Sequence, residues 1–149
     1  MRAVVQRVRR ARVTVSGECV AEMGAGLLAL VGAGHEDGPE AACELARKLV
    51  QLRVFEDSDG RMNASLSDVG GTLGVVSQFT LFGDARKGRR PAFTGAAPRE
   101  RAEPLIERLC EEARALGVPV VTGRFGAMMD VELVNAGPVT LLLDTERIF

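Results

Sequence analysis

The chain contains no tryptophan, no tyrosine and only one histidine, His35, among its 149 residues. A catalytic triad or a histidine-activated cysteine would have to use His35, which lies in a Gly/Asp loop far along the sequence from other candidate groups. Three scattered cysteines without a C-x-x-C pair argue against a zinc site or a disulfide framework. We therefore expect no metal, no other cofactor, and a solvated loop position for His35.

Long apolar runs are also missing, because no stretch approaches the ~20 residues that a membrane helix needs. The first residues alternate as in a strand and lack the apolar block of a signal peptide. The hydrophobic share of 46% and the charged share of 26% are typical of soluble globular proteins. The sequence predicts one cytoplasmic domain over residues 1–149 with no membrane contact.

Neither sign of charge dominates, since the net charge is −1, and a general affinity for polyanions is not expected. Basic residues are nevertheless clustered at 7–12 and at 86–90. Two interpretations remain open for these clusters, a solvated face or a local contact with phosphate groups of a nucleic-acid end. Strand periodicity places the early arginines on opposite faces, which weakens the case for a single patch there.

Val-rich and alternating segments predict strands, and two segments with a period of 3.6 predict helices. The first helix follows Gly38 and reaches about Leu52, and the second covers about 98–116. Pro104 conflicts with the second helix, which must either kink there or begin near Glu103. The predicted strands cover 2–8, 11–15, 19–20, 26–32, 53–56, 73–78, 119–123, 128–135 and 138–144. We expect an α+β fold of mostly antiparallel, barrel- or roll-like sheets with two main amphipathic helices packed on the sheet.

Two short runs at strand ends hold the candidate functional residues, Ser77-Gln78-Phe79-Thr80 and Asn135-Ala136-Gly137-Pro138-Val139-Thr140. Glycine lets a ligand approach the main chain closely, and proline offers a carbonyl without an N–H. The hydroxyls of the first run are weak nucleophiles without a base, and they could simply bond to strand-end backbone. The main chain of 77–80 could form an oxyanion pocket. These patterns alone do not distinguish an enzyme from a ligand-binding module.

The two runs resemble the S-Q-x-T and N-x-G-P-x-T signatures of the D-aminoacyl-tRNA deacylases, also called D-tyrosyl-tRNA deacylases. Residues 86–93 and 122–127 also resemble family segments, and the likeness extends from Met1 to about Asp144. The resemblance implies a homodimeric hydrolase that cleaves the ester between a D-amino acid and the 3′-terminal adenosine of tRNA. It also implies activity on Gly-tRNA, because glycine has no side chain to reject.

The resemblance further implies a role for each site residue. The peptide between Gly137 and Pro138 is expected to be cis, to enter the partner subunit's site and to exclude L side chains. The main chain of 77–80, including Thr80, would position the ester while the terminal ribose 2′-OH assists. Arg7 would orient the Gly-Pro loop. The remaining expected substrate-binding residues are Phe125, Met129 and Asn135, and the first two have core packing as their alternative role.

Three positions depart from the usual family pattern, namely Met128, Asp130 and Ala136. Two other functions remain open, a non-catalytic module that binds tRNA ends and a relative that clears L-alanine from mischarged tRNA. The preferred amino acid, the preferred tRNA and the strength of chiral selection do not follow from the sequence.

Overall fold

A mixed sheet of six strands, built around the 14-residue strand β1, forms the centre of the protein. The structure is a computed structural model that describes residues 1–149. In chain order the elements are β1 (Arg2–Val15), β2 (Glu18–Met23), β3 (Gly26–Gly32), α1 (Pro39–Gln51), β4 (Phe55–Glu56), β5 (Met62–Ala64), α2 (Leu66–Val69), β6 (Thr72–Ser77), the 3₁₀ helix η1 (Phe79–Phe82), α3 (Arg99–Ala115), β7 (Val120–Thr122) and β8 (Asp130–Asp144).

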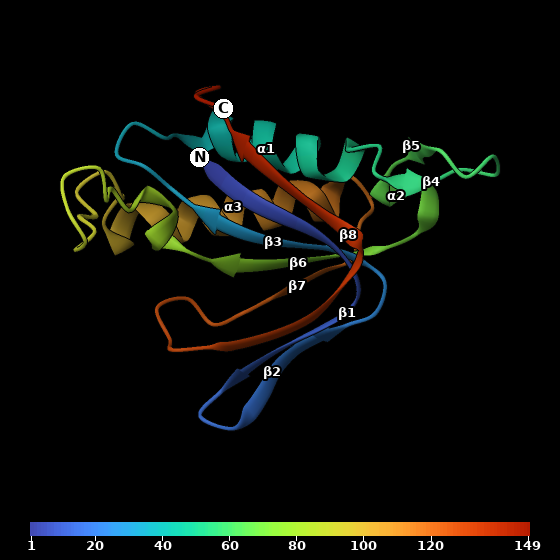
Figure 1. The fold of residues 1–149 in the computed structure, drawn as a ribbon, viewed down its shortest axis with the longest axis horizontal. Helices are drawn as coiled ribbons and strands as arrows, with labels where there is room; N and C mark the ends of the chain where they lie inside the picture. Colours follow the sequence, from blue (N-terminus) through green and yellow to red (C-terminus); the bar gives the residue numbers. More distant parts are fainter.

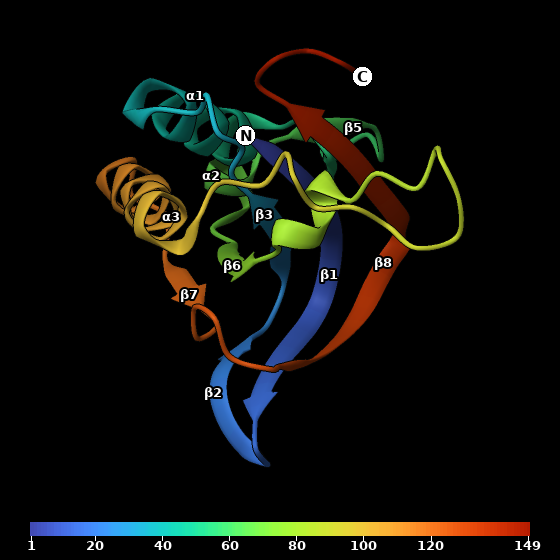
Figure 2. The same cartoon turned by 90° about the vertical axis from the view of Figure 1, so that its left-hand side faces the viewer.

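Strand β1 organises the sheet because it pairs with three other strands. Its first half is antiparallel to β3, its second half is antiparallel to β2, and β8 follows nearly its whole length on the other edge. Strands β3, β6 and β7 continue the sheet as parallel neighbours. Figures 1 and 2 show that the sheet curves strongly into a nearly closed, barrel-like form, with β8 at its margin.

Helices α1 and α3 lie side by side on one face of the sheet and cover the main core (Figure 2). Leu45, Leu49 and Leu109 from the helices are fully buried against strand residues such as Val5 and Leu73. Removing this much apolar surface from water is the main favourable contribution to folding. None of the helices combines the length and apolar character that a membrane-spanning helix needs.

The predicted α+β class, with two main helices on the sheet, is confirmed. Several boundaries were wrong. β1 is one strand over 2–15 instead of two, because shifts in its pairing register let the strand continue past the break expected at 9–10. β8 is likewise one strand over 130–144, and its pairing resumes after the Gly-Pro segment. The strand expected at 53–56 contains only Phe55–Glu56. Helix α3 runs through Pro104, which lies near its N-terminal end and removes a single backbone hydrogen bond.

The short helix α2 was not predicted, although its sequence carries a recognisable start signal. Ser65 accepts a hydrogen bond from the amide of Asp68, and the Asp68 carboxylate accepts one from the amide of Ser65. This reciprocal capping box satisfies two amides that would otherwise lack partners. It stabilises a helix too short to show periodicity.

Candidate active site

The turn that follows β6 forms one wall of the candidate site and lies unusually close to β3. The amide of Gln78 donates to the carbonyl of Val31 at 2.7 Å. A Cβ atom added to Gly32 would lie 2.7 Å from the Gln78 carbonyl oxygen, and one added to Gly34 would lie 2.8 Å from the Phe82 ring. Glycine is therefore needed at both positions for η1 to pack at this distance.

Arg2 fixes the same turn from the side of β1. Its Nη1 donates to the carbonyl of Leu81 at 3.2 Å, and its guanidinium lies 4.4 Å from the centre of the Phe82 ring. Its Nε also donates to Asp144 at 3.1 Å, and that carboxylate is only 1% exposed. A planar guanidinium with several donors can hold three partners at once. Arg2 thus connects η1 to the end of β8.

A cavity of about 480 Å³ opens between this turn, the first half of α3 and the loop that precedes β8. Six predicted site residues line it together, namely Ser77, Gln78, Phe79, Thr80, Phe125 and Met129. The side chain of Gln78 donates to the hydroxyl of Thr80. Phe79 is 57% exposed and packs edge-on against Phe93, with ring centres 5.2 Å apart.

None of the residues that line this cavity is an Asp, Glu, His, Cys, Lys or Arg. The chain therefore offers no ionisable side chain there to act as general acid, general base or metal ligand. The polar groups that line the cavity are those of the main chain, the hydroxyls of Ser77 and Thr80 and the side-chain amide of Gln78, and the rest of the lining is apolar. Fixed main-chain dipoles can stabilise developing negative charge without a titrating group.

The Gly-Pro segment forms a bulge in β8. Residues 136–139 lie opposite a single residue of β1, Arg7, because the pairing register shifts on either side of it. Asn135 closes the neck of this bulge. Its Oδ1 accepts from the amide of Val139 at 2.6 Å, while its Nδ2 donates to the Val139 carbonyl at 3.0 Å and to the Thr140 hydroxyl at 3.1 Å. The Asn135 side chain thus supplies the hydrogen bonds that a neighbouring strand would otherwise give to the backbone of the bulge.

Arg7 holds the tip of the bulge against the body of the protein. Its Nε donates to the Ala136 carbonyl at 2.8 Å and its Nη1 donates to the Val54 carbonyl at 2.6 Å. The peptide between Gly137 and Pro138 is cis, and both residues are exposed. Gly137 has a φ of +142°, a value that residues with a Cβ rarely adopt.

The two halves of the predicted site do not meet within one chain. Ser77 pairs with Val31 of β3, which pairs with Ala3 of β1, whereas the bulge lies opposite Arg7 on the far edge of β1. Ser77 and the bulge are thus separated by three strand spacings of ~4.8 Å across the sheet and by four residues of ~3.3 Å each along the strands. Neither Gly137 nor Pro138 lines the cavity.

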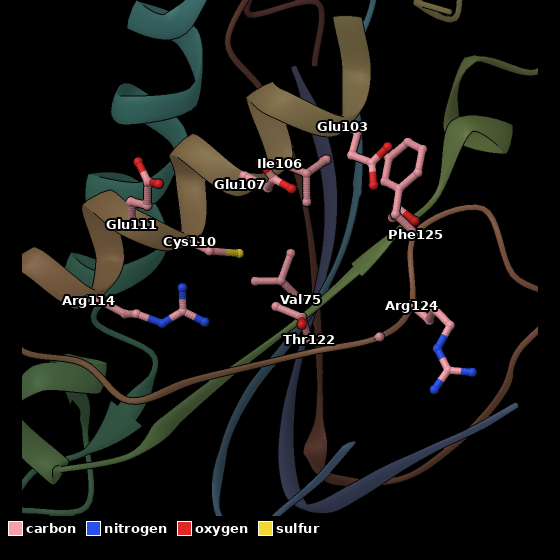
Figure 3. Close-up of a pocket in the computed structure, with 12 residues that line it drawn as sticks. Val75, Glu103, Ile106, Glu107, Cys110, Glu111, Arg114, Thr122, Arg124 and Phe125 are labelled. Carbon is pink, nitrogen blue, oxygen red and sulfur yellow. The ribbon is translucent and has the colours of Figure 1, made fainter. Parts of the chain in front are cut away.

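A second cavity of about 400 Å³ adjoins the first, between α3 and β7 (Figure 3). Glu103, Glu107 and Glu111 line its helical wall, and Cys110 lies between them. Burial raises the pKa of Cys110 to about 11, so its thiol stays protonated at neutral pH and is a poor nucleophile. His35 lies outside both cavities, where its Nε2 bonds to the Thr94 carbonyl at 2.8 Å.

Comparison with known proteins gives a consistent result. Residues 4–144 match the family described as D-Tyr-tRNA(Tyr) deacylase. The D-aminoacyl-tRNA deacylase of Symbiobacterium thermophilum is 57% identical over 149 residues, covering 100% of this chain and 99% of the relative. The D-aminoacyl-tRNA deacylase of Bacillus licheniformis is 58% identical over 146 residues, covering 98% of this chain and 99% of the relative.

Two solved structures share the fold. One, described as c-Myc DNA Unwinding Element Binding Protein, superposes with a TM-score of 0.92 at 41% identity, covering 97% of this chain and 99% of the other. A probable eukaryotic D-amino acid tRNA deacylase superposes with a TM-score of 0.81 at 19% identity, covering 95% of this chain and 97% of the other. The second likeness concerns the fold alone.

The family match and the relatives define the chain as an enzyme of the hydrolase class. It belongs to the D-Tyr-tRNA(Tyr) deacylase family, so the family predicted from its two motifs is confirmed. Sequence reasoning missed Arg2, Asp144 and the two glycines at the end of β3 and just after it, Gly32 and Gly34. A Gly-x-Gly pattern directly after an apolar strand was the one local signal of a close backbone approach at Gly32 and Gly34.

We predict that Gly32→Ala displaces the turn, because the new methyl group meets a backbone carbonyl that cannot rotate away. Hydrolysis of D-Tyr-tRNA, the substrate in the family's name, should fall at least about tenfold, and the free energy of unfolding by about 1–3 kcal/mol. Gly24→Ala is the matched control, since nothing lies within 4 Å of its added Cβ. Full activity of Gly32→Ala would show that the close approach is dispensable.

Proposed function

We propose that the protein hydrolyses the ester between a D-amino acid and the 3′-terminal adenosine of tRNA. The observation that carries this proposal is the cavity, which is lined by the S-Q-x-T main chain and has no ionisable side chain. An aminoacyl ester suits such a site, because the neighbouring ribose 2′-OH can supply the proton-handling group that the protein lacks. The names of the relatives support the same substrate class.

In the proposed reaction, the ester carbonyl lies against the main chain of Phe79 and Thr80. Water attacks the carbonyl carbon, and negative charge develops on its oxygen, where backbone N–H groups stabilise it. The bond to the ribose 3′-oxygen then breaks, the 2′-OH assists the proton transfers, and the products are the free amino acid and tRNA. Thr80 acts as a positioning residue, since its hydroxyl already accepts a hydrogen bond from Gln78.

The terminal adenosine is proposed to bind against Phe125 and Met129, which line the same cavity as the turn. Both side chains are half-buried, so part of each surface is available to a ligand. Stacking or apolar contact with one base contributes ~1–3 kcal/mol. Recognition of the base would thus orient the ester toward the main chain of 77–80.

A homodimer is proposed to complete the site. β8 pairs only with β1, so its other edge is unpaired over 15 residues, and Leu142 on this strand is 57% exposed. Long unpaired edges are normally covered in native proteins. A second copy on this edge would also explain why Gly137 and Pro138 lie away from the cavity of their own chain.

Chiral selection is proposed to work by exclusion. The Gly137–Pro138 segment of the partner would accept from the substrate's α-amino group through its carbonyls and occupy the space that an L side chain needs. A D side chain points elsewhere, and glycine has none. Gly-tRNA should therefore be a substrate together with D-aminoacyl-tRNA.

The test of this function is release of amino acid from D-Tyr-tRNA, L-Tyr-tRNA and Gly-tRNA by the purified protein. We expect rapid hydrolysis of the D and glycyl esters and none of the L ester above the spontaneous rate. Binding of tRNA ends without any hydrolysis would instead support the non-catalytic module. Preference for L-Ala-tRNA would identify the relative that clears mischarged L-alanine.

We predict that Thr80→Ala retains at least about a tenth of the activity on D-Tyr-tRNA. A positioning hydroxyl contributes modestly, whereas loss of a covalent nucleophile removes activity by many orders of magnitude. Single-turnover hydrolysis with saturating enzyme measures this directly. Complete loss of turnover in a folded variant that still binds tRNA would assign the nucleophile to Thr80.

We predict that Gly137→Ala impairs hydrolysis of D-Tyr-tRNA by at least about tenfold. Its Cβ would lie 2.8 Å from Cγ2 of Val139 and 3.0 Å from Nη2 of Arg7, so the segment must shift. Gly60→Ala is the control, because Gly60 also has a positive φ but no atom within 4 Å of the added Cβ. Unchanged turnover of Gly137→Ala would contradict the exclusion model.

A further inference from the structure

A cationic hairpin follows the catalytic turn directly. Residues 83–93 fold back on themselves, and the hairpin is closed by two backbone hydrogen bonds between Asp84 and Ala92, of 2.7 and 2.9 Å. Figure 1 shows this loop projecting from one end of the molecule, beside η1. Its exposed cations are Arg86, Lys87, Arg89 and Arg90.

The charge of this hairpin is concentrated at its tip. Arg86 is occupied at the base, where it forms a two-pronged ion pair with Asp84 at 2.9 and 2.6 Å. This pairing holds the pKa of Asp84 well below its usual range, so the carboxylate is charged at neutral pH and pairs with Arg86. Lys87, Arg89 and Arg90 form no ion pair, and no acidic residue occurs between residues 85 and 99.

The two sides of the cavity differ in charge. On the side of α3, the adjoining groove is lined by three glutamates, Glu103, Glu107 and Glu111, and by two arginines, Arg114 and Arg124, so it carries no excess of positive charge. On the other side the chain passes from Thr80 into the hairpin, and Lys87 is seven residues away, at most about 25 Å along the chain. An RNA strand whose end occupies the cavity therefore meets a groove of mixed charge in one direction and a cluster of unpaired cations in the other, which favours the second path.

We propose that the acceptor strand of the tRNA leaves the cavity over the 86–90 hairpin and that its phosphates contact Lys87, Arg89 and Arg90. This inference rests on the proposed function, because it names the path of the same substrate. Contacts of this kind neutralise backbone phosphates and release counterions, so they make binding dependent on salt and indifferent to sequence. The hairpin thus recognises the RNA backbone, while the cavity recognises the ester and the terminal base.

The test compares two substrates that share one ester, D-Tyr-tRNA and 3′-O-D-tyrosyl-adenosine. The double variant Lys87→Gln/Arg89→Gln should lower kcat/KM for the tRNA about tenfold at ~0.1 M salt. It should also make the slope of log kcat/KM against log salt shallower by about 1–2. Hydrolysis of the adenosine ester, which has no phosphate, should be unchanged.

The matched control is Lys48→Gln/Arg61→Gln, which also removes one lysine and one arginine charge. These exposed residues lie in the last turn of α1 and in the β4–β5 turn, which Figure 1 places at the end opposite the hairpin. Both substrates should be hydrolysed at the wild-type rate by this variant. An equal loss in the control, an equal loss on both substrates, or no loss in the hairpin variant would each overturn the proposal.

Failure of the proposed function would be recognised separately, because the wild-type protein would then hydrolyse neither ester. In that case the same variants are compared for binding of uncharged tRNA over a range of salt concentrations. A shallower salt dependence in the hairpin variant alone would still support the phosphate contacts. An unchanged dependence would overturn them.

Discussion

The site depends on two guanidinium groups held by one strand, since Arg2 and Arg7 of β1 each fix a segment that has no regular partner. Arg2 holds the turn after β6 through the Leu81 carbonyl, and Arg7 holds the bulge of β8 through the Ala136 carbonyl. A guanidinium stays charged at any physiological pH and offers several donors in a fixed plane. β1 can support both segments because it pairs with β3, β2 and β8 and so lies at the centre of the sheet.

A cavity without ionisable side chains has consequences for how the enzyme works. If the reaction takes place in this cavity as proposed, the pH dependence of the chemical step comes from the substrate, from water or from residues outside the cavity, since no lining side chain is ionisable. In the proposed mechanism, main-chain dipoles that are oriented before the ester arrives stabilise the oxyanion without reorganisation. In the proposed mechanism activity depends on the position of a backbone turn, and Gly32 helps to set that position because a Cβ there would meet the Gln78 carbonyl oxygen.

The helices and the α+β class could be predicted from the sequence, because apolar residues recur at helical spacing in each helix, as Leu45 and Leu49 do in α1 and Leu105 and Leu109 do in α3, and occupy the core. The bulge in β8 could not be predicted. The local pattern shows that Pro138 interrupts the ladder of strand hydrogen bonds, but not that the Asn135 side chain replaces the missing bonds. The contacts of Arg2 were also hidden, since its partners Leu81 and Asp144 are distant in sequence. The first motif identified the cavity wall, but residue spacing alone did not show that the Gly-Pro segment lies away from it; only the family resemblance implied that this segment enters the site of a partner subunit.

The separation of the two halves has a functional logic under the proposed dimer. Asn135 and Arg7 fix the Gly-Pro bulge within its own chain, through side-chain hydrogen bonds to backbone groups. The proposed excluding element is therefore held by its own chain without a partner or a substrate, and little conformational entropy remains to be lost on binding. A rigid wall rejects an L side chain by steric overlap, whereas a flexible one would yield to it. Chiral selection would thus depend on the stiffness of the bulge and on its seating against the second subunit.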